Sequence, residues 1–364
     1  MAYISKDLQA GQENLALNFQ FVSFSTRFPK MPQANDPKQS ERWGITIPFE
    51  GVPLYEQGEW YKELQDLGYS DVWSAEADGT DAFVPLAIAA MSAPELRLGS
   101  AVVPAFTRGP ALLAMQVDTL SELARGRFAF GIGTSSNVIV ERWNDIQFEA
   151  PLAKVRDTVR FLKEALGGQK VKSEYETFKV DGFKLGRRRG QGDVRQVPPI
   201  MVAGLRPHML QLAGREAEGA ILNWLGANDV KKAVAEVLKG SKGEEREIVA
   251  RIFVIPSQDA DTARAVGRMA IAAYLNVPVY AAFHEWLGRG ELLSGMWEAW
   301  KAGDRQKALQ EIPDQVVDDL IVHGSYQECK EHIRKYVENG VTTPVMAVIP
   351  VGVDDREAIR ALKP

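Results

Sequence analysis

The chain contains only one cysteine, Cys329, in 364 residues. A single cysteine excludes an intramolecular disulfide and a multi-cysteine metal site, and this usage is typical of proteins from a reducing cytosol. Histidine is also scarce, with His208, His284, His323 and His332 as the four copies. They lack the close spacing of metal ligands. We therefore expect structural roles for the histidines and no metal site.

Long apolar runs and an excess of positive charge are absent as well, and no secretory leader is expected. No stretch reaches the roughly 18 apolar residues that a membrane-spanning helix needs, and residues 1–14 lack a basic start followed by an apolar core. The net charge of −5 argues against general binding to nucleic acid or a membrane surface, because both favour a basic protein. We expect a soluble, cytoplasmic protein whose partner is a small molecule.

Short apolar segments alternate with helical patterns from Trp43 almost to the C-terminus. The predicted strands are residues 43–49, 71–74, 96–103, 127–133, 200–203, 219–222, 250–256 and 345–350. Largely uninterrupted apolar strands with helices between them indicate a buried parallel sheet, either open and doubly wound or closed. Eight repeats without a central linker favour the closed (β/α)₈ TIM barrel. Long segments after the fourth and seventh strands predict insertions that cover the active site.

Residues 1–41 differ from the rest of the chain. Three prolines lie between Thr26 and Pro37, and apolar periodicity is weak there. Such a pattern predicts an extended N-terminal arm, followed by one barrel domain over residues 42–364.

Side chains that follow the strands of a barrel line its active site. Glu76 follows the second strand, where a carboxylate can orient a ring N–H or accept a proton. The alternative is that it caps the following helix or pairs with an arginine. Glu141 follows the fourth strand and is interpreted as lining a substrate pocket, with a loop salt bridge as the alternative. The sequence Gly131-x-Gly133 lacks the third glycine of a dinucleotide fingerprint. Its glycines either admit a ligand close to the backbone or form a tight turn.

Two further patterns are candidates for anion binding. The capping box from Ser325 to Glu328 predicts a helix that runs to residues 339–340. Gly324 leaves the first amides of that helix open to a phosphate. Helix capping alone explains the pattern about as well, and the position late in the barrel favours the phosphate. The basic cluster of Lys184, Arg187–Arg189 and Arg195 either is solvated or binds an anionic ligand.

Several of these segments together resemble a known family. The matching stretches are Ala75–Leu86, Arg97–Pro104, Leu123–Gly133, Ala203–Pro207, Glu218–Asn223 and Val322–Cys329. Their order along Trp43–Pro350 is similar to that of the luciferase-like flavin and deazaflavin oxidoreductases, in particular the branch that depends on coenzyme F420. The resemblance implies a TIM barrel with the cofactor's tricyclic ring over its mouth.

The resemblance also implies which residues contact the cofactor. A non-prolyl cis peptide, Ala101–Val102 by position, would lie behind the ring. Glu76 would lie near the ring, and Gly324 with Ser325 would contact its phosphate. The implied cofactor-binding residues are Glu76, Ala101, Val102, Val103, Gly133, Thr134, Ala203, Gly204, Asn223, Gly324 and Ser325.

One position departs from the family pattern. Some F420-dependent relatives carry a catalytic histidine directly after the carboxylate of the second strand, and this chain has Ala77 there. The departure argues against sugar-phosphate dehydrogenase chemistry and leaves the proton donor unassigned, with Glu141 as the substitute candidate. The expected catalytic residues are thus Glu76 and Glu141.

The resemblance predicts hydride transfer between F420 and a small organic substrate. An FMN-dependent monooxygenase of the same fold is the alternative enzyme, and a cofactor-binding protein without turnover is the alternative outside enzymes. Relatives are commonly dimers, which leaves a homodimer open.

Overall fold

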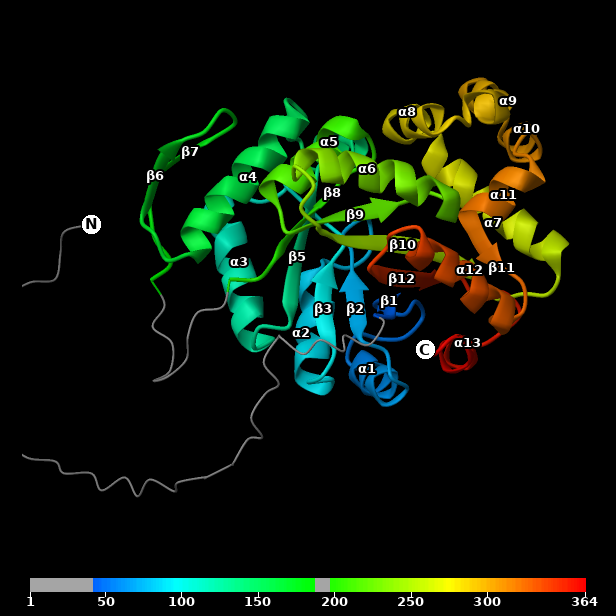
Figure 1. Ribbon diagram of the computed structural model, residues 1–364, viewed down its shortest axis with the longest axis horizontal. Helices are drawn as coiled ribbons and strands as arrows, with labels where there is room; N and C mark the ends of the chain where they lie inside the picture. The colour runs from blue at the N-terminus through cyan, green and yellow to red at the C-terminus, as the bar shows by residue number, and fades with distance from the viewer. Residues whose placement is uncertain (1–41, 187–196) are drawn as a thin grey trace, which may run out of the picture. The chain divides into compact units, whose positions relative to one another are not determined.

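The computed structural model describes residues 42–186 and 197–364. The arm expected over residues 1–41 lies outside the described residues, as do Arg187–Arg189 and Arg195 of the basic cluster. Figure 1 shows the described elements.

Eight parallel strands close into a barrel, as the sequence predicts. They are β1 (Gly44–Thr46), β2 (Asp71–Ser74), β3 (Arg97–Ser100), β5 (Phe128–Gly133), β8 (Ile200–Ala203), β9 (Gly219–Asn223), β10 (Glu247–Ile255) and β12 (Thr343–Val348). The ring closes because β12 pairs with both β1 and β10. The short strand β4 (Val103–Pro104) continues the third barrel strand, and β11 (Ile321–His323) extends the edge beside the end of β10.

Helices surround these strands (Figure 1). They are α1 (Gln57–Asp66), α2 (Phe83–Ser92), α3 (Pro110–Leu123), α4 (Pro151–Leu166), α5 (Pro207–Glu216), α6 (Val230–Gly240), α12 (Tyr326–Glu338) and α13 (Asp355–Ala361). Helices α3, α4 and α5 each begin at a proline, whose fixed φ and missing N–H suit the first helical position.

The barrel interior is packed in layers. One buried cluster takes a residue from each of six strands: Trp73, Ala129, Met201, Ile221, Val249 and Val345. The neighbouring strand provides Gly99, where an added Cβ would lie 2.2 Å from the Trp73 ring, so glycine makes room for the indole. Beneath this layer Arg97 pairs with Glu247 at 2.6 Å and with Asp71 at 3.4 Å. The barrel is therefore filled by side chains at these two levels.

Two insertions extend the barrel, where the sequence predicts them. After β5 come the π-helix η1 (Val138–Trp143) and, beyond α4, the antiparallel hairpin of β6 (Val171–Glu174) and β7 (Lys179–Phe183). After β10 come α7 (Ala260–Leu275), α8 (Pro278–Leu287), α9 (Gly290–Lys301), α10 (Arg305–Gln310) and α11 (Asp314–Leu320). A second buried cluster, with Ile271, Met296 and Val316 among its members, holds the second insertion together.

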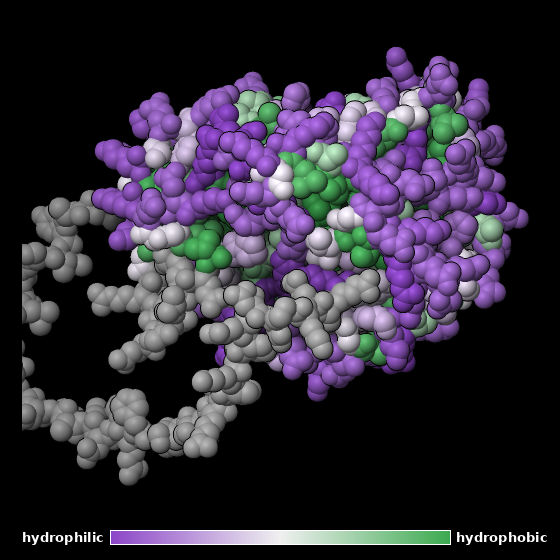
Figure 2. All heavy atoms as spheres, in the orientation of Figure 1, coloured by the Kyte–Doolittle hydropathy of each residue, from purple (hydrophilic) through white to green (hydrophobic). Residues whose placement is uncertain are grey.

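Figure 2 shows a mostly hydrophilic face with hydrophobic residues in small separate groups. Among residues 42–186 and 197–364, no single helix is both long and apolar enough to cross a membrane. Helices α7 and α8 pass that test only as a pair, and they are bent by 110° where they meet.

Candidate active site at the mouth of the barrel

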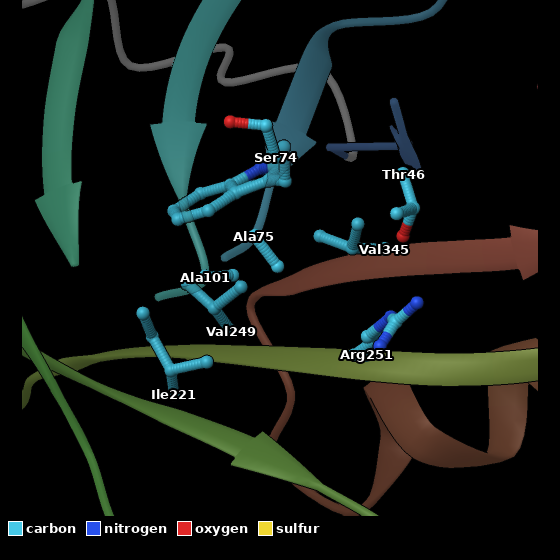
Figure 3. A pocket seen from close by; sticks show the side chains of 9 residues that line it. Thr46, Ser74, Ala75, Ala101, Ile221, Val249, Arg251 and Val345 are labelled. Atoms are coloured by element: carbon cyan, nitrogen blue, oxygen red, sulfur yellow. The ribbon is translucent and has the colours of Figure 1, made fainter. Parts of the chain in front are cut away.

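A pocket opens at the carboxyl ends of the strands, with an empty volume of about 250 Å³ that includes open solvent. It is lined by Thr46, Trp73, Ser74, Ala75, Ala101, Ile221, Val249, Arg251 and Val345. Figure 3 shows Ile221 and Arg251 on one side and Ser74 and Thr46 on the other. Most of the lining is apolar, so the few polar groups decide what the pocket accepts.

The peptide bond between Ala101 and Val102 is cis, as the resemblance implies. Two backbone hydrogen bonds connect this bend to the segment after β2. The Ala101 N–H donates to the Ser74 carbonyl at 2.6 Å, and the Glu76 N–H donates to the Val102 carbonyl at 3.3 Å. The bend carries Ala101 and Val102, both partly exposed, to the rim of the mouth.

Gly133 and Ala203 lie beside this bend. A Cβ added to Gly133 would lie 2.9 Å from Val102 Cγ2 and 3.2 Å from Ala203 Cβ. The three residues therefore meet in a small apolar surface. Val103 and Gly204 are buried behind it, and Thr134 is partly exposed just after Gly133. The structure thus brings together most of the residues that the resemblance assigns to the ring.

Glu76 lies in this region, but its carboxylate is not free. Arg108 donates to both carboxylate oxygens at 2.6 Å, and the Ala82 N–H donates to Oε1 at 3.0 Å. The guanidinium of Arg108 also lies over the Phe83 ring, 5.4 Å from its centroid. An ion pair with an arginine and a cap on the following helix are the structural alternative for Glu76, and both are present. With both carboxylate oxygens so occupied, these contacts oppose a role in accepting a proton.

Glu141 lies on the π-helix η1 and is exposed. It does not line the pocket, which takes no residue from η1. Its role as a proton donor stays a prediction.

A tyrosine that the sequence did not single out lies beside Asn223, the last residue of β9. Burial raises the pKa of Tyr280, on α8, to about 12, and Tyr274 acts in the same direction. A hydrogen bond with Asn223 and the positive charge of Arg251 act against this rise. Asn223 and Arg251 are partners in the pairing of β9 with β10. The insertion thus places a phenol beside the ends of these strands, where periodicity gave no signal.

The helix predicted from Ser325 is present, with both halves of its capping box. Ser325 N–H donates to Glu328 Oε2 at 2.8 Å, and Glu328 N–H donates to Ser325 Oγ at 3.3 Å. These bonds occupy two amides at the helix start and place a carboxylate there. Gly324 has φ +123°, which favours glycine. Capping therefore accounts for the pattern, and the phosphate contact stays a prediction.

None of the four histidines, for which we expect structural roles, lines the pocket. His323 Nε2 is 2.9 Å from Asp318 Oδ1, and His284 is fully buried. Among the described residues, no group of three or more histidine, cysteine, aspartate or glutamate side chains is placed to hold a metal ion.

Fold and mouth together define a (β/α)₈ barrel with a non-prolyl cis peptide at the carboxyl end of its third strand. The family described as luciferase-like monooxygenase matches residues 25–343. The chain belongs to this family.

Individual relatives align with this chain over most of their own length. A 5,10-methylenetetrahydromethanopterin reductase of Archaeoglobus fulgidus is 27% identical over 85% of this chain and 94% of its own. A putative coenzyme F420-dependent oxidoreductase of Mycobacterium tuberculosis is 24% identical over 83% of this chain and 94% of its own. The solved F420-dependent tetrahydromethanopterin reductase of Methanopyrus kandleri has a TM-score of 0.72 at 21% identity, covering 88% of this chain and 97% of that one. This last similarity shows the shared fold.

Proposed function

We propose that this protein is an F420-dependent oxidoreductase that transfers a hydride between the deazaflavin and a small organic substrate. The observation that carries the proposal is the apolar surface where the cis bond Ala101–Val102 meets Gly133 and Ala203. A flat ring can lie on such a surface because no long side chain rises from it. The names of the two sequence relatives favour the same activity.

The residues present fit a bound deazaflavin. Ala101, Val102 and Ala203 would support the ring, while Val103, Gly133 and Thr134 would approach it through backbone atoms. Glu76, held by Arg108, would orient a ring N–H. Gly204 and Asn223 would contact the far side and the tail. A phosphate contact at Gly324 and Ser325 would require the Glu328 carboxylate to move away from the start of α12. When bound, F420 supplies the hydride from a ring carbon and reacts poorly with oxygen, so the protein has to bind, orient and protonate.

Titration of the purified protein with F420 and with FMN, followed by fluorescence, tests the cofactor. We expect binding of F420 in the micromolar range or tighter, and weaker binding of FMN. Binding of FMN without binding of F420 would instead favour the monooxygenase activity from which the family takes its name. Tight F420 binding without reduction of any enone, imine or ketone in a substrate screen would favour a carrier without turnover.

We also propose that the protein is a cytoplasmic homodimer. Helices α2 and α3 pack against each other, and both expose apolar side chains. These are Val84 and Met91 on α2 and Leu112 and Met115 on α3. Such a patch on adjacent helices suits contact with a second copy of the chain.

A further inference from the structure

Three polar side chains of the mouth pocket have a buried atom without a hydrogen-bond partner among the described residues. The atoms are Thr46 Oγ1, Trp73 Nε1 and Arg251 Nε. The remaining polar side chain of the lining is satisfied, because Ser74 Oγ donates to the Ala82 carbonyl at 2.6 Å. Unpaired buried polar atoms are uncommon in folded proteins. All three side chains line the same pocket, and a group bound there would supply the absent partners.

The chemistry of these atoms defines that ligand. An indole N–H and a guanidinium can only donate hydrogen bonds, and a hydroxyl can donate one as well. The absent partner is therefore an acceptor. Figure 3 shows the Thr46 hydroxyl oxygen pointing toward the side chain of Arg251, so the two residues can address one bound group.

The charge of Arg251 is not balanced by its surroundings. In the layer below, Arg42 and Arg97 are paired with Asp71 and Glu247, two positive charges against two negative ones. No carboxylate lines the pocket, and Arg251 forms no ion pair within the described parts of the chain. Its contact is with the Phe253 ring, whose centroid is 4.9 Å from the guanidinium carbon. A partly buried cation without a partner favours an anion over a water molecule.

We propose that this pocket binds a carboxylate of the substrate, and that the substrate is a small organic acid. The inference rests on the proposed function and names the substrate class for it. The enclosed space of the pocket is about 10 Å³, room for about one water-sized group, so it admits a carboxylate oxygen and not a whole ligand. The pocket therefore takes the acidic end of the substrate, and the remainder lies toward the rim at Ala101 and Ala203.

The test compares crotonate with crotonamide, which have the same shape but differ in charge. Full-length protein without cofactor is labelled with ¹⁵N at tryptophan and titrated with each compound. The indole N–H signal of Trp73 is assigned by its loss in Trp73→Phe. We expect crotonate to shift this signal and crotonamide to leave it in place at equal concentration. Equal effects of the two compounds, or no effect of either, would overturn the proposal.

Variants of the lining residues test whether crotonate binds in this pocket. Arg251→Gln should weaken crotonate binding by about tenfold or more, because it removes a charge-assisted hydrogen bond. Thr46→Val should weaken it less. Arg215→Gln, on the exposed face of α5, changes the charge equally and should have no effect. Crotonate binding by folded Arg251→Gln with wild-type affinity, or a crystal soaked in crotonate that holds only ordered water in the pocket, would contradict the proposal.

F420 binding is measured on the same variants. We expect Arg251→Gln to bind F420 as the wild type does. Loss of F420 binding in this variant, with no crotonate effect in the wild type, would assign the three donors to the cofactor. That result would refute the carboxylate site and leave the proposed function standing. Crotonate binding in a protein that does not bind F420 would refute the proposed function and leave the carboxylate site standing.

Discussion

Arg108 donates to both carboxylate oxygens of Glu76, with Nη1–Oε2 and Nη2–Oε1 distances of 2.6 Å. The two side chains are 15% and 12% exposed. This bidentate geometry fixes the carboxylate beside the barrel mouth. Glu76 is thereby suited to hold a ligand N–H in place.

The first prediction concerns this ion pair. Glu76→Gln and Arg108→Met should each lower the free energy of unfolding by about 3 kcal/mol, because each leaves one largely buried charge alone. The double variant should lose less than the sum, with a coupling of about 1–3 kcal/mol. Urea unfolding of the four proteins measures this cycle. Additive losses would show that the pair does not act as a unit.

Glu141→Gln tests the expected proton donor. If Glu141 moves a proton, single-turnover hydride transfer should slow by about 100-fold, the low end for general acid catalysis. Glu149→Gln changes an exposed glutamate in the same segment and serves as the control. An unchanged rate in Glu141→Gln would remove Glu141 from the mechanism and leave Tyr280 as the candidate proton donor.

Gly133→Ala should disturb the surface on which the ring is proposed to lie. The new Cβ would lie 2.9 Å from Val102 Cγ2, so Val102 must move. We expect F420 affinity to fall by about tenfold and stability by about 1–3 kcal/mol. Gly290→Ala is the control, because its Cβ would meet its neighbours at 3.6 Å or more. Equal F420 affinity in both variants would argue against a ring on this surface.

His284 predicts how stability depends on pH. Burial, with the charge of Arg289 adding to it, lowers the pKa of this fully buried imidazole to about 3. Between about pH 6.5 and 3 the unfolded chain therefore binds a proton that the folded protein does not, and acid favours unfolding. This group should account for a loss of about 2 kcal/mol between pH 7 and pH 5.

The variant His284→Gln cannot take up that proton, so its free energy of unfolding should fall less between pH 7 and pH 5. His208→Gln, at an exposed position on α5, is the matched control and should keep the wild-type dependence. Parallel curves for wild type and His284→Gln would contradict the prediction.

The dimer prediction depends on the apolar faces of α2 and α3. Met91→Glu combined with Met115→Glu should convert the dimer to a monomer, because the new carboxylates would be buried without partners. Light scattering after size exclusion measures the mass. Met269→Glu, at an exposed methionine on α7, is the control and should remain dimeric. A monomeric wild type would refute the proposal.

Local patterns in the sequence predict much of the fold. The apolar run at β8 predicts this strand at its observed bounds, because side chains buried on both sides of a parallel sheet leave no polar alternation. Strand β2, with Val72 and Trp73 between two polar residues, is also predicted at its observed bounds. Proline at the first position marks the starts of α3 and α5, and the capping box marks α12. The hairpin of β6 and β7 escaped prediction, since most of its side chains are partly or fully exposed and give no apolar period.

The sequence by itself thus determined a barrel, its family likeness and the segments at its mouth. These follow from local patterns, which are the apolar strand segments, the helical spacing of three or four residues and the short motifs. Only the tertiary structure decided which polar groups meet. Glu76 and Arg108 are 32 positions apart, and the unpaired donors Thr46, Trp73 and Arg251 come from β1, β2 and β10. Their pairing, or its absence, follows from the closure and register of the strands, which no local pattern specifies.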